Sequence, residues 1–233
     1  MFGLDNWIAG LSSGTSFAVV LLVAVLLGLR HATDPDHMAA VTTLITSGKE
    51  RATRSAARLG AWWGLGHALT LVLFGIPILV AGRYLPERVD QGAETAVGAL
   101  IAFLAIRLLV RWRHGYFDLH AHPHPEQQHR HAVRTPAGAF GIGLVHGMGG
   151  SAGIGVLLLA AIPSETVAVA SLVVLAFFTA VSMTIVTSGF GWTLSLRPVA
   201  GAVAASIPAI GLASLAFGLW YSAAAWNVIP YPF

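Results

Sequence analysis

The sequence contains no cysteine among its 233 residues. Disulfides and thiolate metal sites are therefore excluded, and cysteine usage gives no information about the redox compartment. Charged residues are also scarce, because they make up 10% of the chain where a soluble domain has about 25%. This deficit indicates a surface that faces something other than water.

Basic residues are absent from the first part of the chain, since no Lys or Arg precedes Arg30. A cleaved signal peptide begins with a basic region, so we expect the first apolar run to be a retained membrane span. Elsewhere Lys and Arg do not form stripes with interleaved aromatic residues, which argues against nucleic-acid binding. The sequence also lacks a nucleotide-binding motif.

Apolar residues dominate what is present, at 56% of the chain, and the mean hydropathy is +0.74. They form about six segments that are long enough to cross a bilayer. Open sheets cannot lie in lipid, and the segments are too long for barrel strands, so we expect helices. The sequence therefore predicts an all-α integral membrane protein rather than a soluble domain with a large core. The segments are 17–47, 57–82, 93–112, 136–162, 166–192 and 199–226.

Basic residues gather in alternate connections between these segments. Four follow the first segment, four follow the third and one follows the fifth: Lys49, Arg51, Arg54, Arg58, Arg111, Arg113, Arg130, Arg134 and Arg197. Basic connections stay in the cytoplasm. The pattern predicts a multi-pass protein of the cell (inner) membrane with both termini outside and the connection 113–135 in the cytoplasm.

The two halves of the chain resemble each other. Gly28-Leu29-Arg30-His31 returns as Gly143-Leu144-Val145-His146, and later segments match at almost the same spacing. Because each half has three spans, the second copy would enter the membrane from the opposite side. We therefore predict a 3+3 inverted repeat, an architecture typical of transporters, with halves 1–112 and 136–233 around the loop 113–135.

The densest group of ionisable side chains lies inside the first apolar segment, in the stretch GLRHATDPDHMAAV. It contains Arg30, His31, Asp34, Asp36 and His37. Each ionised side chain at membrane depth costs at least ~2.5 kcal/mol, so such a group requires mutual pairing or a bound ion. The alternative interpretation is a polar loop that joins two short helices at the membrane surface.

A break in the first helix would gather these side chains. Pro35 removes a backbone hydrogen bond, and we expect the helix to break there. The break could bring His31, Asp36 and His37 around one point, as a ligand set suited to Ni, Co, Zn or Cu. Asp34 is counted with this metal-binding group, and Arg30 would balance the carboxylates.

Isolated histidines also occur in two other segments. His67 lies in the second and His146 in the fourth, where it matches His31 under the repeat. Each could bind or hand on an ion, or could be a packed structural residue. The loop 113–135 contains a histidine-rich tract. Its composition is typical of a segment that binds metal ions weakly, and the alternative is a solvated loop whose histidines have no role. Its histidines are His114, His120, His122, His124, His129 and His131.

The first motif resembles the signature of the nickel/cobalt permeases (the NiCoT family). The matching residues are Arg30, His31, Ala32, Asp34, Asp36 and His37, and Leu65-Gly66-His67 is similar to the second motif of the family. The resemblance implies that His31, Asp36 and His37 bind the transported divalent ion.

The second half departs from that family. Where the permeases have an Asp-Thr-Ala-Thr-Glu motif, this chain reads Gly149-Gly150-Ser151-Ala152-Gly153, without either acid. The run from His146 to Ala152 is more similar to the six-span branch related to urease accessory proteins of the UreH type.

Secondary transport of Ni²⁺ or Co²⁺, with Zn²⁺ as a further candidate, is therefore the leading hypothesis. The ion is cargo, and no cofactor is required. The expected partners are the lipid bilayer, the divalent ion and an energising or metallochaperone protein. Two other hypotheses stay open. One is a membrane-embedded metal-dependent hydrolase or acyltransferase, because such enzymes also use His/Asp sets. The other is a metal-sensing accessory membrane protein.

Overall fold

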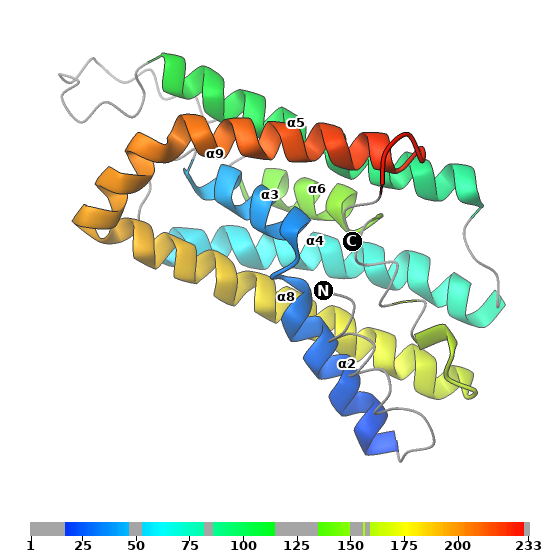
Figure 1. The fold of residues 1–233 in the computed structure, drawn as a ribbon. Helices are drawn as coiled ribbons and strands as arrows, with labels where there is room; N and C mark the ends of the chain where they lie inside the picture. Colours follow the sequence, from blue (N-terminus) through cyan, green and yellow to red (C-terminus); the bar gives the residue numbers. More distant parts are fainter. Residues whose placement is uncertain are drawn as a thin grey trace.

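The computed structural model describes residues 17–46, 53–81, 86–114, 135–149, 156 and 159–230. This part of the chain forms helices joined by short turns and contains no strand, which confirms the all-α class (Figure 1). The helices are α2 (Phe17–His31), α3 (Pro35–Thr46), α4 (Thr53–Ala81), α5 (Glu87–Arg113), α6 (Pro136–His146), α8 (Glu165–Ser195) and α9 (Arg197–Ala224).

Four of these helices, α4, α5, α8 and α9, are long and apolar enough to cross a membrane. Helices α2 and α3 are bent by 46° at the break between them and can count together as a fifth span. The chain is thus a helical membrane protein with four to five candidate spans in its described part. The sixth span stays a prediction.

The apolar run expected over 136–162 does not form one continuous helix. Helix α6 has 11 residues, which is a length of about 16 Å and too short to cross a bilayer. It ends at His146, and a turn follows at 147–149. The reason is local, because two glycines within that turn, Gly147 and Gly149, lower the helix propensity where the hydropathy stays high.

Two pairs of long helices enclose the short ones. Helix α5 packs along α9, and α4 packs along α8, with α3 and α6 between the two pairs (Figure 1). A Cβ built at Gly60 would meet Thr187, and one at Gly75 would meet Leu172, so α4 and α8 run antiparallel. Helix α2 lies outside this core against α8.

The short helix α6 approaches α4 backbone to backbone. A Cβ on Gly66 of α4 would overlap the Phe140 carbonyl oxygen, and one on Gly143 of α6 would overlap the Trp63 carbonyl oxygen. Small residues permit such contact between membrane helices. The contact fixes the end of α6, and therefore His146, beside the middle of α4.

Two interhelical hydrogen bonds are accepted by carbonyls at corresponding positions in the halves, although their donors do not correspond. The Ser182 hydroxyl of α8 donates to the Leu29 carbonyl of α2, and the Thr70 hydroxyl of α4 donates to the Leu144 carbonyl of α6 at 3.0 Å. Each acceptor lies two residues before the last residue of its helix. The helix contacts follow the same pattern. Helix α2 of the first half packs on α8 of the second half, and α6 of the second half packs on α4 of the first half. This is the pattern that a two-fold relation would give, while the inverted repeat itself stays a prediction.

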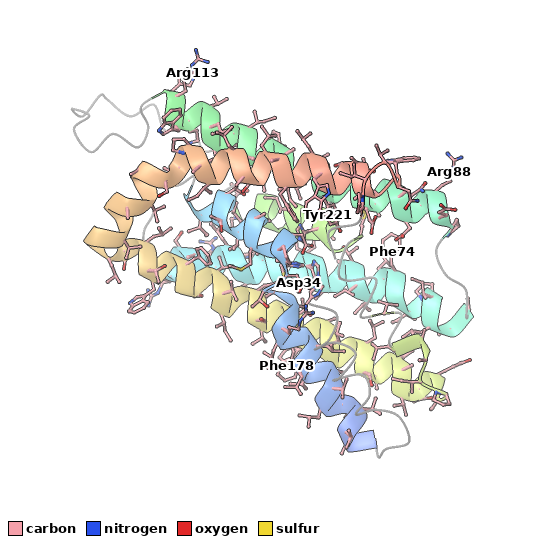
Figure 2. All side chains as sticks on the ribbon, viewed as in Figure 1. Asp34, Phe74, Arg88, Arg113, Phe178 and Tyr221 are labelled. Carbon is pink, nitrogen blue, oxygen red and sulfur yellow. The ribbon has the colours of Figure 1, made fainter. Side chains whose placement is uncertain are left out.

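Large apolar side chains cover the outside of the bundle. Figure 2 shows Arg88 and Arg113 at opposite ends of α5, and the exposed apolar residues of that helix lie between them. These are Val89, Phe103, Ile106, Val110 and Trp112 on α5, with Leu65, Leu69 and Leu73 on α4 and Phe177 and Ile185 on α8. An apolar surface of this kind fits hydrocarbon rather than water.

The α4–α6 contact yields a test with a control in the same helix. We expect Gly143→Ala to destabilise the protein by about 1–3 kcal/mol, because the new methyl group forces α6 away from α4. Gly141→Ala should be neutral or stabilising, since a Cβ there meets nothing within 4 Å and alanine is the better helix former. Thermal unfolding of the purified proteins in detergent measures both. Equal melting temperatures for the two variants would contradict the packing described.

Candidate metal centre

The break between α2 and α3 is built by local sequence. The Thr33 hydroxyl donates to the Arg30 carbonyl at 2.6 Å and closes the end of α2. Pro35 is the first residue of α3, a position where its missing N–H costs nothing. The Asp34 carbonyl accepts the first helical bond, from the Met38 N–H at 2.9 Å. The predicted break at Pro35 is thus confirmed, and the side chains of His31, Asp34 and Asp36 at the break are buried.

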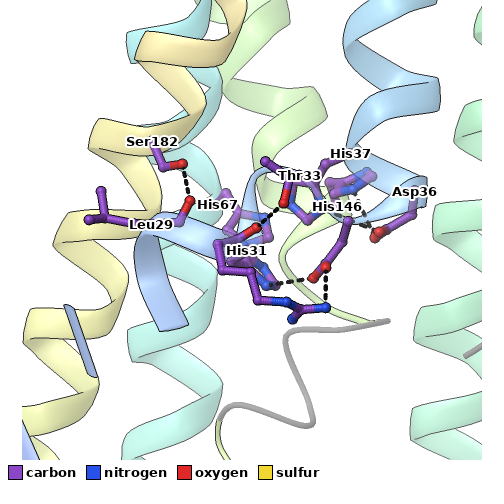
Figure 3. Close-up of polar contacts among 10 residues, drawn as sticks. Leu29, His31, Thr33, Asp36, His37, His67, His146 and Ser182 are labelled. Carbon is purple, nitrogen blue, oxygen red and sulfur yellow. Dashed lines mark hydrogen bonds and ion pairs between the residues drawn. The ribbon is translucent and has the colours of Figure 1, made fainter. Parts of the chain in front are cut away.

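Four histidines from four helices meet at this break (Figure 3). His31 is the last residue of α2 and His146 the last of α6, whereas His37 lies in the first turn of α3 and His67 in the middle of α4. All four are at most 7% exposed. The ring centroid of His37 lies 4.6 Å from that of His31, 5.0 Å from that of His67 and 4.4 Å from that of His146. His37 is therefore the centre of the cluster.

Asp36 brings a carboxylate into this group. It is fully buried, with one oxygen 3.3 Å from His37 Nδ1 and the other 3.2 Å from His146 Nε2. These close contacts lack good hydrogen-bond geometry, and neither the Asp36 oxygens nor the ring nitrogens of His37 and His146 form any other hydrogen bond within the described part of the chain. Buried polar atoms are nearly always paired, so this many unsatisfied ligand atoms in one place indicates a site built for an ion.

Asp34 lies on the other side of His31. Its carboxylate is 3.1 Å from the Arg30 guanidinium and 3.3 Å from His31 Nδ1. A carboxylate at Nδ1 favours the tautomer with its proton there, which leaves the Nε2 lone pair available. That Nε2 atom lies 3.0 Å from His67 Nε2. Asp34, which the sequence predicts to be one of the metal-binding residues, thus contacts the His31 ring and belongs to neither of the ligand groups below.

The ligand atoms fall into two groups of three. One is His31, His37 and His67, and the other is Asp36, His37 and His146; within each, the ligand atoms lie within 4.8 Å of one another. Around one ion, with bonds of about 2.1 Å, ligand atoms are up to about 4.2 Å apart. A small adjustment of side chains would therefore let either group close around a metal ion. These five residues are among the six that the sequence predicts to bind metal, and the structure brings them together. The sixth, Asp34, lies outside both groups.

Trp63 is a neighbour of the cluster that sequence reasoning missed. Its ring is 1% exposed and lies 5.8 Å, centroid to centroid, from both His37 and His146. It shares a face of α4 with His67 because the two are four residues apart. That spacing was the only signal in the sequence, and it does not distinguish Trp63 from a lipid-facing tryptophan.

The histidine-rich loop is separate from this centre as far as the structure describes it. His114 is exposed and follows the last residue of α5, beside Arg113 at the end of that helix. The other histidines expected to capture metal, His120, His122, His124, His129 and His131, lie outside the described residues.

Comparisons with known proteins agree with this centre. Residues 17–141, more than half of the chain, match the family model NicO, described as "High-affinity nickel-transport protein". The chain is 28% identical to the "Urease accessory protein UreH" of Bacillus sp. (strain TB-90), over 87% of this chain and 90% of that protein.

A second relative is more similar in sequence but over less length. It is the "High-affinity nickel transport protein" of Cupriavidus necator, 36% identical over 112 residues, which are 47% of this chain and 31% of the relative. No solved structure matches the chain. The resemblance inferred from the first motif is confirmed: the chain belongs to the NicO family of high-affinity nickel-transport proteins.

Proposed function

We propose that this membrane protein moves Ni²⁺ through the centre formed by Asp36 and the four histidines. The observation that carries the proposal is the convergence of five buried metal-ligand side chains at a helix break inside an apolar bundle. Four of them, Asp36, His37, His67 and His146, have ligand atoms without a hydrogen-bond partner among the described residues. A helix broken within a membrane protein is where transporters place their substrate sites. The nickel named for the family and for the Cupriavidus relative supports the choice of metal.

The charge of the centre favours a divalent cation. Asp34 contacts Arg30, so those two charges offset each other. Among the residues that the structure describes, the groups at the Asp36 oxygens are imidazoles, and a neutral imidazole leaves the negative charge uncompensated. An isolated charge at membrane depth is costly, so a cation that binds here is stabilised by the charge it removes.

The donor atoms favour transition metals over hard cations. Imidazole suits Ni²⁺, Co²⁺ and Zn²⁺, whereas Mg²⁺ and Ca²⁺ prefer sets made of oxygen atoms. The ion is the cargo of the protein, and Co²⁺ and Zn²⁺ are expected competitors. Asp34 acts as a positioning residue that holds His31 with its Nε2 atom toward His67.

Transport would follow the topology expected from the basic residues. The halves 1–112 and 136–233 act as an inverted repeat, with 113–135 in the cytoplasm collecting ions at the inner end of the path. An ion or proton gradient, or a separate energising protein, supplies the energy. The likeness to a urease accessory protein favours a partner on the cytoplasmic side that receives nickel, which is a metallochaperone role.

Asp36→Asn tests the centre with little change in shape. We expect Ni²⁺ uptake at limiting concentration to fall by more than about 100-fold, because the negative charge of Asp36 is lost. Asp90→Asn is the matched control, since Asp90 is exposed near the start of α5. Uptake of radioactive nickel by cells, normalised to protein in the membrane, is the measurement. Equal Ni²⁺ uptake by the Asp36→Asn and Asp90→Asn variants would contradict the proposal.

Asp34→Asn tests the positioning role. Loss of an outer partner of a metal-bound histidine costs 10–100-fold in affinity, so we expect Ni²⁺ binding to weaken by about that factor. We expect the variant still to bind one ion per chain, because in this proposal Asp34 is not itself a ligand. Isothermal titration of the purified protein with Ni²⁺ separates affinity from stoichiometry. Complete loss of binding would show instead that Asp34 is a ligand.

The orientation can be measured in the cysteine-free chain with single introduced cysteines. Gly92→Cys and Arg113→Cys place an exposed thiol toward opposite ends of α5. We expect a membrane-impermeant maleimide to label the first in intact cells and the second only after permeabilisation. The reverse pattern would place the loop 113–135 outside and overturn the orientation.

A further inference from the structure

We propose that the centre holds one ion at a time in either of two overlapping ligand sets, and that transport passes the ion between them at His37. The imidazole set is His31, His37 and His67, and the carboxylate set is Asp36, His37 and His146. The inference rests on the proposed function and deepens it, because it divides one site into two successive positions.

The geometry divides the cluster at His37. His31 and His67 lie on one side, joined by their Nε2 atoms at 3.0 Å, and Asp36 and His146 lie on the other, in contact at 3.2 Å. The rings of His67 and His146 are 6.0 Å apart, farther than any pair that includes His37 within the cluster. Among the described residues, no group of four brings its ligand atoms within the 4.8 Å that each triplet meets.

The chemistry of imidazole makes the two sets mutually exclusive. A neutral imidazole has one nitrogen with a lone pair and one that carries a proton, so His37 donates electrons to one ion at a time. Simultaneous occupancy would require His37 to lose a further proton and two divalent ions to lie side by side in a low-dielectric interior. One chain therefore binds one ion, in one set or the other.

The two sets differ in whether they include a residue from the second half of the protein. All three members of the imidazole set come from α2, α3 and α4, whereas the carboxylate set takes His146 from α6. A displacement of α6 relative to α2 would change the relative closeness of the two sets while leaving His37 at the centre. His37 lies in the first turn of α3, directly after the break, where a small rotation of the helix end turns its ring.

The sets also differ in what they select. The carboxylate set provides the negative charge that draws in any divalent cation, while the imidazole set has no charge and requires an ion that bonds well to nitrogen. An ion that depends on oxygen ligands would stop at the carboxylate set. Passage through both sets therefore filters for nickel-like ions.

The test uses the purified full-length chain with Ni²⁺ alone as the probe. His67→Gln and His146→Gln each remove one ligand from one set and keep a polar side chain in its place. X-ray absorption at the nickel edge counts imidazole ligands, and equilibrium dialysis counts ions per chain. We expect both variants to bind one ion, with two imidazoles and a carboxylate in His67→Gln and three imidazoles in His146→Gln. Both should lose Ni²⁺ flux into proteoliposomes.

His37→Gln completes the series because it belongs to both sets. We expect its Ni²⁺ affinity to fall by more than about 100-fold, well beyond the loss in either single-set variant. Elution as a single species in size-exclusion chromatography establishes that each variant is folded, and His67→Ala and His146→Ala replace a glutamine variant that is not. Identical nickel spectra for the two single-set variants, or equal losses of affinity for all three, would overturn the inference.

The outcome separates this inference from the proposed function. If the unmodified chain binds no Ni²⁺ and moves none, the proposed function fails. If it binds and moves Ni²⁺, but the two single-set variants give one common spectrum, the five side chains form a single site. Only the division into two sets would then be wrong.

Discussion

The charge of Asp36 is the constraint around which this structure is organised. A fully buried carboxylate within a membrane bundle requires partners, and the partners that the fold provides are two imidazoles. A lysine or arginine beside it would have neutralised the charge and closed the site to cations. Here Arg30, the arginine at the break, contacts Asp34 instead. The negative charge therefore stays available to an ion.

The packing of the backbone serves the same constraint. The end of α2 and the end of α6 each bring a histidine to the interior, and hydroxyls of α8 and α4 bind carbonyls close to these ends. Glycines let α6 lie directly on α4, so that His146 reaches the group of His37 and His67. Trp63 fills the side of the cluster toward α4. The surrounding fold thus fixes five side chains that come from four separate helices.

Much of this could be predicted from sequence because membrane insertion makes charge costly. Hydropathy and Pro35 predict the broken first helix, and the rarity of ionisable residues in apolar segments marks His67 and His146. What could not be predicted depends on tertiary packing. Nothing in the sequence shows that Asp34 contacts His31 but belongs to neither ligand group. Nothing in it shows that Trp63 lies beside His37. Hydropathy also fails to predict that α6 ends at His146. Glycine interrupts a helix, but it lowers the mean hydropathy of the segment too little to mark a boundary.

The central claim is that the chain itself carries Ni²⁺ across a bilayer through this buried centre. The most direct measurement is Ni²⁺ entry into proteoliposomes that contain only the purified protein, read by a nickel-sensitive dye inside. The account predicts saturable entry that an inward-directed gradient drives, that excess Co²⁺ inhibits and that excess Mg²⁺ does not. Entry no faster than into protein-free vesicles, with the protein folded and able to bind Ni²⁺, would contradict it.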